Sequence, residues 1–204
     1  MLKEARDSQS SLPAPEVLLQ QELDEHRDAF EATSHMLKQP FLEILDLIEG
    51  AVRRGGKVLL FGNGGSAADA QHIAAELIIR YKADRAAIPA IALTTDSSAL
   101  TACANDMGFE AVFERQIEGL GREGDVAIGI STSGTSANVL RALTQAKIMG
   151  LKTVGLTGGA GGRMREVCDA LIVVPSSVTA RIQEMHILIG HVLCKALEVR
   201  LGLV

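Results

Sequence analysis

The sequence contains no tryptophan, one tyrosine and three cysteines among 204 residues. Cys103, Cys168 and Cys194 are odd in number and lie far apart, so neither a disulfide framework nor a zinc-knuckle spacing is present. No apolar run reaches the roughly 18 to 20 residues that span a bilayer, and no basic segment with an apolar core opens the chain. We therefore expect a reduced, cytoplasmic protein that is neither secreted nor inserted in a membrane.

An excess of positive charge is also missing. The formal net charge is −5, with acidic and basic residues interspersed. A protein that binds the phosphate backbone of nucleic acids normally shows a basic face, so nucleic acid is not expected as a partner. Apolar residues are abundant instead. They make up 47% of the chain, which is enough for the core of one domain.

The N-terminal segment differs from the rest of the chain. Residues 1–15, MLKEARDSQSSLPAP, carry no periodic apolar pattern, and we expect them to be disordered. Residues 16–204 are expected to form a single domain. It begins with two predicted amphipathic helices, over 16–38 and from Pro40 to Val52, because proline suits the first turn of a helix. Their apolar surface exceeds what one sheet face covers, so we expect them to pack against another subunit.

Five short apolar runs follow. Runs that are apolar throughout, rather than alternating, indicate strands buried on both faces of a parallel sheet. The expected strands are 58–61, 90–94, 126–130, 153–157 and 170–174, and the expected helices lie within 66–82, 97–120, 136–149, 163–168 and 179–200. The pattern predicts an α/β fold, a doubly wound parallel sheet of the flavodoxin-like type, which binds ligands at the carboxyl ends of its strands.

Polar loops follow four of these strands: GNGGS at 62–66, TTDSS at 94–98, STSGTS at 131–136 and TGGAGG at 157–162. Because the carboxyl ends of parallel strands share one edge, these loops can converge on one ligand. The hydroxyls, the glycine and the following helix N-terminus of STSGTS suit a phosphate monoester. Alternatively, its residues only cap the helix that begins at Ser136. TGGAGG is interpreted as a flexible connection.

Two helices carry ionisable groups with the spacing of a site. His72 and Glu76 are four residues apart on one helix face, where they form a metal site, an acid–base pair or an ordinary surface pair. The last helix places Gln183, His186 and His191 in an apolar stretch, and such groups need partners or a function. Of the two histidines, His186 is the ligand that spacing from Gln183 alone favours.

A nucleotide site is the alternative from another class. Gly62, Gly64 and Ala67 fit the loose dinucleotide pattern G-x-G-x-x-A, and Asp96 stands where a ribose-binding acid is expected. This leaves a nucleotide-binding oxidoreductase open, although that arrangement has no role for a second phosphate-type loop.

Five motifs, taken together and in order, resemble the sugar isomerase (SIS) domain family and, within it, the bacterial phosphoheptose isomerases. They are GNGGSAADAQH with Glu76, NDMGF at 105–109, GISTSGTSANV, GLTGGAGG, and TARIQEMH with His191. The resemblance covers the chain from about residue 16. It implies a five-stranded parallel sheet between helices, assembled as a homotetramer with active sites at subunit contacts.

The resemblance also implies roles for individual residues. Those implied to bind the phosphate are Ser131, Thr132, Ser133 and Ser136. Those implied to line the sugar site are Asn63, Gly64, Gly65, Ser66, Glu76, Asn105, Asp106 and Gln183. Glu76 and His191 would be the catalytic pair, and His72, Glu76, Gln183 and His191 match the family's ligands for Zn²⁺, one ion per subunit. Gln183 and His191 are about 12 Å apart along a helix, so they share an ion only if their side chains converge or one comes from a neighbouring subunit.

The implied reaction isomerises sedoheptulose 7-phosphate to D-glycero-D-manno-heptose 7-phosphate through an enediolate, the first step toward ADP-heptose, lipopolysaccharide and related surface glycans. The alternative within the family is a non-catalytic tetrameric adaptor that binds the bacterial replication initiator. That relative shares RIQEMH-like residues but lacks counterparts of Glu76 and His191, and both are present here. Thr135 and Ala180 depart from the family pattern and leave the finer substrate preference open.

Overall fold

The computed structural model describes residues 13–204, so the prediction of disorder for 1–15 falls almost entirely outside the described residues. Five strands form one sheet in the order β2-β1-β3-β4-β5, and every neighbouring pair is parallel. They are β1 (Val58–Gly62), β2 (Ala90–Ala92), β3 (Val126–Ser131), β4 (Lys152–Gly158) and β5 (Ala170–Val174). The predicted doubly wound α/β fold is confirmed.

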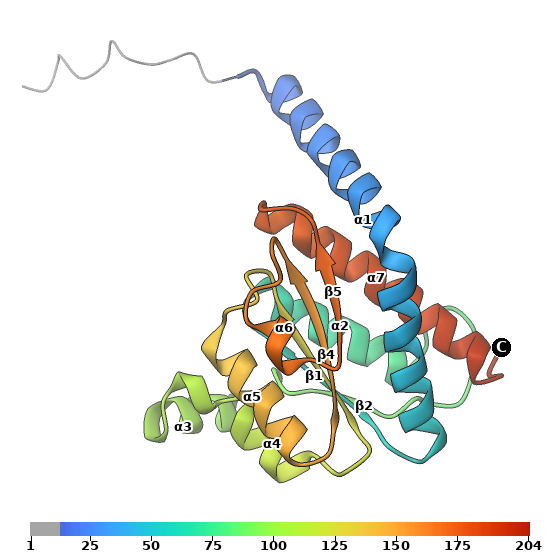
Figure 1. Cartoon of the computed structure of the whole chain (residues 1–204), viewed down its shortest axis with the longest axis vertical. Helices are drawn as coiled ribbons and strands as arrows, with labels where there is room; N and C mark the ends of the chain where they lie inside the picture. Colours follow the sequence, from blue (N-terminus) through green and yellow to red (C-terminus); the bar gives the residue numbers. More distant parts are fainter. Residues whose placement is uncertain (1–12) are drawn as a thin grey trace, which may run out of the picture.

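Helices cover both faces of the sheet (Figure 1). One apolar core joins the sheet to α1 (Pro15–Arg53), α2 (Gly65–Ile78) and α7 (Thr179–Arg200). The opposite core joins it to α3 (Ser97–Asp106), η1 (Phe109–Ala111), α4 (Glu114–Leu120), α5 (Ala137–Ile148) and α6 (Met164–Val167). None of the helices in residues 13–204 combines the length and apolar character that crossing a membrane requires.

Strand β1 shows why an uninterrupted apolar run was the right signal. Its side chains alternate between the two cores, with Val58 and Leu60 in the first and Leu59 and Phe61 in the second. All four are fully buried. Since neither face of the strand meets water, neither can carry the polar residues of an alternating pattern.

The prediction of two leading helices is wrong, because α1 is a single helix of 39 residues that contains Pro40. A proline inside a helix removes one backbone hydrogen bond and bends the axis, at a cost of about 3 kcal/mol. Leu37 and Phe41 pack against the core on either side of Pro40. We attribute the continuity of the helix to this packing, which offsets the local cost.

The two halves of α1 lie in different surroundings. Ile44, Leu45, Ile48 and Ala51, in the C-terminal half, are buried in the first core. The N-terminal half extends beyond the domain in Figure 1. It leaves large apolar side chains exposed, namely Val17, Leu18, Leu19, Leu23, Phe30 and Met36. This surface is the apolar excess that the sequence predicted.

Candidate active site

Two of the predicted loops form one pocket at the carboxyl edge of the sheet, as the rule for parallel sheets requires. The pocket has a volume of about 300 Å³ and lies between the ends of β1 and β3 and the start of α7. Its lining residues are Asn63, Gly64, Gly65, Ser66, Ile130, Ser131, Thr132, Ser136, Thr179 and Gln183. Ser133 and Thr132 line an adjoining hollow of about 310 Å³. Most residues implied to bind a sugar phosphate therefore gather in one place.

The hydroxyl groups of the STSGTS loop bond mainly to one another. Ser131 Oγ lies 2.9 Å from Ser136 Oγ and 3.4 Å from Ser133 Oγ. Ser136 is the N-cap residue of α5, yet its side chain makes no capping hydrogen bond. A loop that served only to cap α5 would direct this hydroxyl at the helix. The capping alternative is therefore wrong for Ser136, and its hydroxyl faces the pocket.

A pair of amides joins the two loops. Asn63 Nδ2 donates to Asn138 Oδ1 at 2.9 Å, and Asn138 Nδ2 donates to Asn63 Oδ1 at 2.8 Å. Asn138 is buried and also accepts the backbone N–H of Val139 at 2.9 Å. The Asn63 side chain is thereby held in one orientation at the pocket wall. Asn138 was not among the predicted site residues, and its only sequence signal was its place two residues after STSGTS.

The glycines of the first loop make room for neighbouring groups. A Cβ atom on Gly62 would lie 2.7 Å from the Ile130 carbonyl oxygen. At Gly65 it would lie 2.4 Å from Gln183 Nε2, so the amide of Gln183 rests directly on the backbone of the loop. Any larger residue at 65 would push Gln183 away. The loop is thus a wall that a ligand and Gln183 can approach closely.

The TGGAGG segment packs against the STSGTS loop. A Cβ atom on Gly134, whose φ is +67°, would lie 2.3 Å from the carbonyl oxygen of Gly161. Met164 N donates to the Gly134 carbonyl at 3.2 Å. Glycine at 134 is therefore needed both for its positive φ and for the close approach of the Gly161 carbonyl oxygen.

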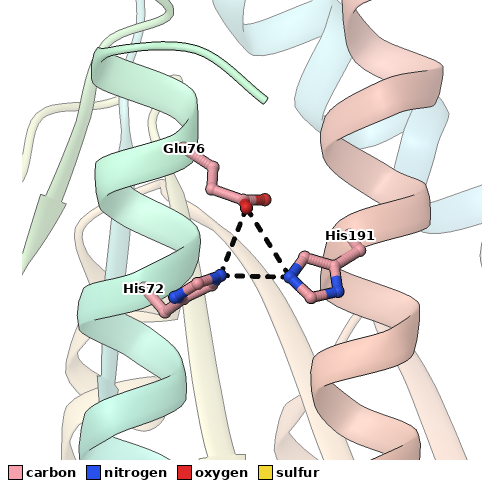
Figure 2. A group of neighbouring side chains, drawn as sticks. All are labelled: His72, Glu76 and His191. Carbon is pink, nitrogen blue, oxygen red and sulfur yellow. Dashed lines mark hydrogen bonds and ion pairs between the residues drawn. The ribbon is translucent and has the colours of Figure 1, made fainter. Parts of the chain in front are cut away.

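Three ionisable side chains meet further along α2, as Figure 2 shows. His72 Nε2 lies 3.2 Å from Glu76 Oε1 and 3.0 Å from His191 Nε2. His191 Nε2 lies 3.6 Å from Glu76 Oε1. Glu76 is the most buried of the three, with 16% of its side chain exposed. His72 and Glu76 are therefore not an isolated pair on one helix, because His191 of α7 contributes a third group.

Close packing of α2 against α7 makes this meeting possible. Gly190 of α7 is buried, and a Cβ atom there would lie 2.6 Å from Ile73 Cδ1 of α2. With no side chain at 190, the two helices approach closely just where His72 and His191 lie. Gly65 and Gln183 make the corresponding contact about two turns earlier. The pocket and the three ionisable groups thus lie at two successive levels along the same pair of helices, α2 and α7.

The three groups fit a zinc ion. Two imidazole nitrogens that face each other form a hydrogen bond only if one is protonated, whereas neutral imidazoles both suit a cation between them. Zinc bound at about 2.0–2.1 Å in tetrahedral geometry holds its ligand atoms roughly 3.3 Å apart. The observed separations are 3.0, 3.2 and 3.6 Å. In addition, Glu76 Oε2 is buried without a hydrogen-bond partner among the described residues.

Two further residues surround this group. The ring of Tyr81 lies against that of His191, with centroids 5.7 Å apart and an interplanar angle of 31°. Cys194 is fully buried in α7, and its pKa is raised first by burial and then by the nearby charge of Glu76. The thiol therefore remains protonated and neutral. Neither residue was predicted, since neither lies in a recognisable motif.

Other predicted residues lie outside these two levels. Asn105 and Asp106 end α3, where Asn105 Nδ2 donates to Asp106 Oδ1 at 2.7 Å, and neither lines the pocket of Ser131 and Gln183. Asp96 accepts the Ala99 N–H at 2.9 Å and caps α3. This cap accounts for Asp96 without a nucleotide ribose.

His186 is not placed with the other ionisable groups. It is fully buried, and its Nε2 donates to the Thr157 carbonyl of β4 at 3.1 Å. The expectation from spacing, which favoured His186 over His191, is wrong because five residues along a helix turn the side chain to another face. On the same helix, Arg181 Nη2 forms an ion pair with Glu184 Oε1 at 2.7 Å.

Comparison with known proteins identifies close relatives. The SIS domain family model matches residues 23–158. A phosphoheptose isomerase of Paramagnetospirillum magneticum is 57% identical over 180 residues, which cover 88% of this chain and 94% of the relative. The solved phosphoheptose isomerase of Neisseria gonorrhoeae is 41% identical with a TM-score of 0.86, covering 91% of this chain and 100% of that one. The Francisella tularensis phosphoheptose isomerase is 34% identical with a TM-score of 0.89, covering 92% and 100%.

Proposed function

Because the chain belongs to the SIS domain family and, within it, to the phosphoheptose isomerases, we propose that it isomerises sedoheptulose 7-phosphate to D-glycero-D-manno-heptose 7-phosphate. The observation that carries this proposal is the arrangement of α2 and α7. One end of the helix pair borders a pocket lined with hydroxyls, and His72, Glu76 and His191 meet about 10 Å further along. A long sugar phosphate can be held at one level and react at the other.

The hydroxyl loop binds the non-reacting end of the substrate in this proposal. Ser131, Thr132, Ser133 and Ser136 donate to the phosphate, with backbone N–H groups at the start of α5. Asn63, Gly64, Gly65, Ser66 and Gln183 contact the sugar. Binding energy from the phosphate is thereby used to orient C1 and C2 at the other end of the site.

Glu76 and His191 transfer the protons in this proposal. Glu76 takes a proton from C1 of the ketose and returns one to C2, while His191 moves a proton between the oxygen atoms. The 3.6 Å between His191 Nε2 and Glu76 Oε1 allows Glu76 to reach C1 and C2 while His191 reaches the oxygen atoms on the same two carbons. Packing against Ile73 and Tyr81 holds the two helices and the His191 ring in place.

We propose Zn²⁺ as the ion that His72, Glu76 and His191 hold. An atom whose lone pair is bound to the ion cannot take up a proton, so Glu76 and His191 act in proton transfer only by changing their coordination. A bound zinc ion would polarise the sugar carbonyl and stabilise negative charge on the adjacent oxygens. Gln183, the fourth ligand implied by the resemblance, rests on Gly65 in this structure. Gln183 can therefore be a ligand only if its side chain moves away from Gly65. Otherwise the fourth ligand must come from another subunit.

Assembly is the second part of the proposal. Single chains expose the apolar N-terminal half of α1. We propose that this surface is covered in a cytoplasmic homotetramer, in which another subunit brings Asn105 and Asp106 to the sugar. Light scattering on Phe30→Glu should then give a smaller particle than wild type, while Glu31→Gln, on the same helix, should not. A tetramer that survives Phe30→Glu and Leu23→Glu together would contradict the use of this surface.

The direct test of function is turnover. Purified protein with added Zn²⁺ is incubated with sedoheptulose 7-phosphate, and aldose formation is followed. We expect Glu76→Gln to lower kcat by about 10²- to 10⁴-fold, the usual contribution of a positioned base. Glu118→Gln, at an exposed ion pair of α4, is the matched control. Wild-type turnover in Glu76→Gln would remove the base assignment. Absence of turnover in the wild type, with capture of the replication initiator, would favour the adaptor.

A further inference from the structure

One ion pair is buried almost completely beside the catalytic helices. Arg85 Nε lies 2.9 Å from Glu198 Oε1, and the two side chains are 0% and 3% exposed. Among the ion pairs of residues 13–204, this pair alone has both side chains so fully removed from solvent. Burying two charges costs several kcal/mol per ion unless further hydrogen bonds satisfy them, so such a pair is rarely kept for stability alone.

The remaining donors of Arg85 bind the end of α2. Nη2 donates to the carbonyl of Glu76 and Nη1 to the carbonyl of Leu77, both at 2.7 Å. Nη1 also donates to the Ala86 carbonyl at 3.0 Å. Carbonyls in the last turn of a helix have no partner within the helix. Here the guanidinium supplies one for Glu76, and it shares the Leu77 carbonyl with the backbone N–H of Ile88, which donates at 3.0 Å. Arg85 thus holds the backbone of Glu76 itself.

Glu198 connects the same pair to His191. It lies on α7 seven residues, or about two turns, after His191. Its Oε1 also accepts the backbone N–H of Tyr81 at 3.0 Å, and the Tyr81 ring lies against the His191 imidazole. The Glu198 carboxylate therefore anchors the segment that follows α2 and holds the Tyr81 ring against the imidazole of His191.

We propose that Arg85 and Glu198 are positioning residues that set the distance between Glu76 on α2 and His191 on α7. The bonds run from Glu198 through Arg85 to the Glu76 carbonyl, and from Glu198 through Tyr81 to the His191 ring. An apolar pair of similar volume could fill this space, but it would make no directional bond to Glu76 or Tyr81. The inference rests on the proposed function, because it concerns the geometry of that active centre.

The chain itself provides a reporter for this geometry. It has one tyrosine and no tryptophan, so its intrinsic fluorescence comes from Tyr81 alone. Acrylamide quenching of metal-free protein then measures how firmly this ring is packed beside His191. Titration with Co²⁺, followed by visible absorption, measures how well His72, Glu76 and His191 converge on one cation.

The variants are Arg85→Met and Glu198→Gln, with Arg85→Lys as the conservative change. The control is Asp125→Asn, which breaks a partly buried ion pair with Lys57 at the opposite, amino edge of β1 and β3.

We expect Arg85→Met to weaken Co²⁺ binding by about 10- to 100-fold, the usual effect of removing a group that orients metal ligands. Acrylamide quenching should at least double, kcat should fall, and KM should stay within about twofold because the phosphate loop is untouched. Arg85→Lys should recover part of each loss.

The outcomes separate this inference from the proposed function. If Arg85→Met does not fold, Glu198→Gln, which keeps an amide oxygen for Tyr81 N, carries the test. Co²⁺ affinity and quenching that match the wild type in a folded variant would overturn the positioning role, even if the wild type is an active isomerase. Equal losses in Asp125→Asn would also overturn it. If the wild type lacks isomerase activity but the Arg85 and Glu198 variants still weaken Co²⁺ binding, the proposed reaction fails and the positioning role stands.

Discussion

Lowering the pH from 7 to 5 should reduce the free energy of unfolding by about 2 kcal/mol through His186 alone. This imidazole is 0% exposed, donates from Nε2 to the Thr157 carbonyl, and has no partner for Nδ1 among the described residues. Burial disfavours the charged ring and lowers the pKa of His186 from 6.5 to about 4. The hydrogen bond to Thr157 acts in the opposite direction and is the smaller effect.

The direction of the pH effect follows from where the proton binds first. Because the pKa of His186 is lower in the folded protein, the unfolded chain takes up the proton earlier as the pH falls. The stability that neutral His186 contributes is therefore complete above about pH 6.5 and is lost as the pH falls toward 4. At pH 5 most unfolded molecules but only about a tenth of folded ones are protonated, which corresponds to about 2 kcal/mol.

The assay compares urea unfolding of the wild type and His186→Gln at pH 7 and pH 5, followed by circular dichroism. Protein concentration is kept constant, since assembly changes the apparent stability. The wild type should lose about 2 kcal/mol more than His186→Gln between the two pH values. His35→Gln, at an exposed position of α1, should behave as the wild type. If the wild-type and His186→Gln curves run parallel from pH 7 to 5, the argument from burial is refuted.

Three further predictions concern the active site. Removing metal with a chelator should abolish isomerase activity, and adding Zn²⁺ should restore it. Elemental analysis checks that the treated protein is free of metal. Full activity in that protein would exclude the metal role of His72, Glu76 and His191. Gly65→Ala should displace Gln183 and raise KM with little change in Tm. Gly119→Ala, where a Cβ meets nothing within 4 Å, should leave KM unchanged and should not lower Tm, because alanine suits the interior of α4 better than glycine. Ser136→Ala should raise KM about 10-fold or more through a lost phosphate contact, without the stability loss of a missing helix cap, because Ser136 makes no capping bond. A lower Tm with unchanged KM would contradict the last prediction.

Much of the fold was predictable because its signals are local. Each strand is a short apolar run, and β5 and α7 have the predicted boundaries, Ala170–Val174 and Thr179–Arg200. The pairing of His72 with Glu76 was predictable for the same reason, since a spacing of four residues places both on one helix face. The error at Pro40 shows the limit of such signals. Local chemistry favoured a break there, but the packing of Leu37 and Phe41 against the core, on either side of the proline, maintains one helix.

What the sequence determined by itself was the kind of chemistry: the hydroxyl loop, the apolar strands, and the ionisable residues on two helices. Only the tertiary structure decided which of these meet. Gly190 allows α7 to approach α2, so that His191 and not His186 reaches Glu76. Arg85 and Glu198, 113 residues apart, carried no signal in the sequence. The physical reason is that a contact between distant segments depends on the direction in which a side chain leaves its helix, and spacing along the chain does not record it.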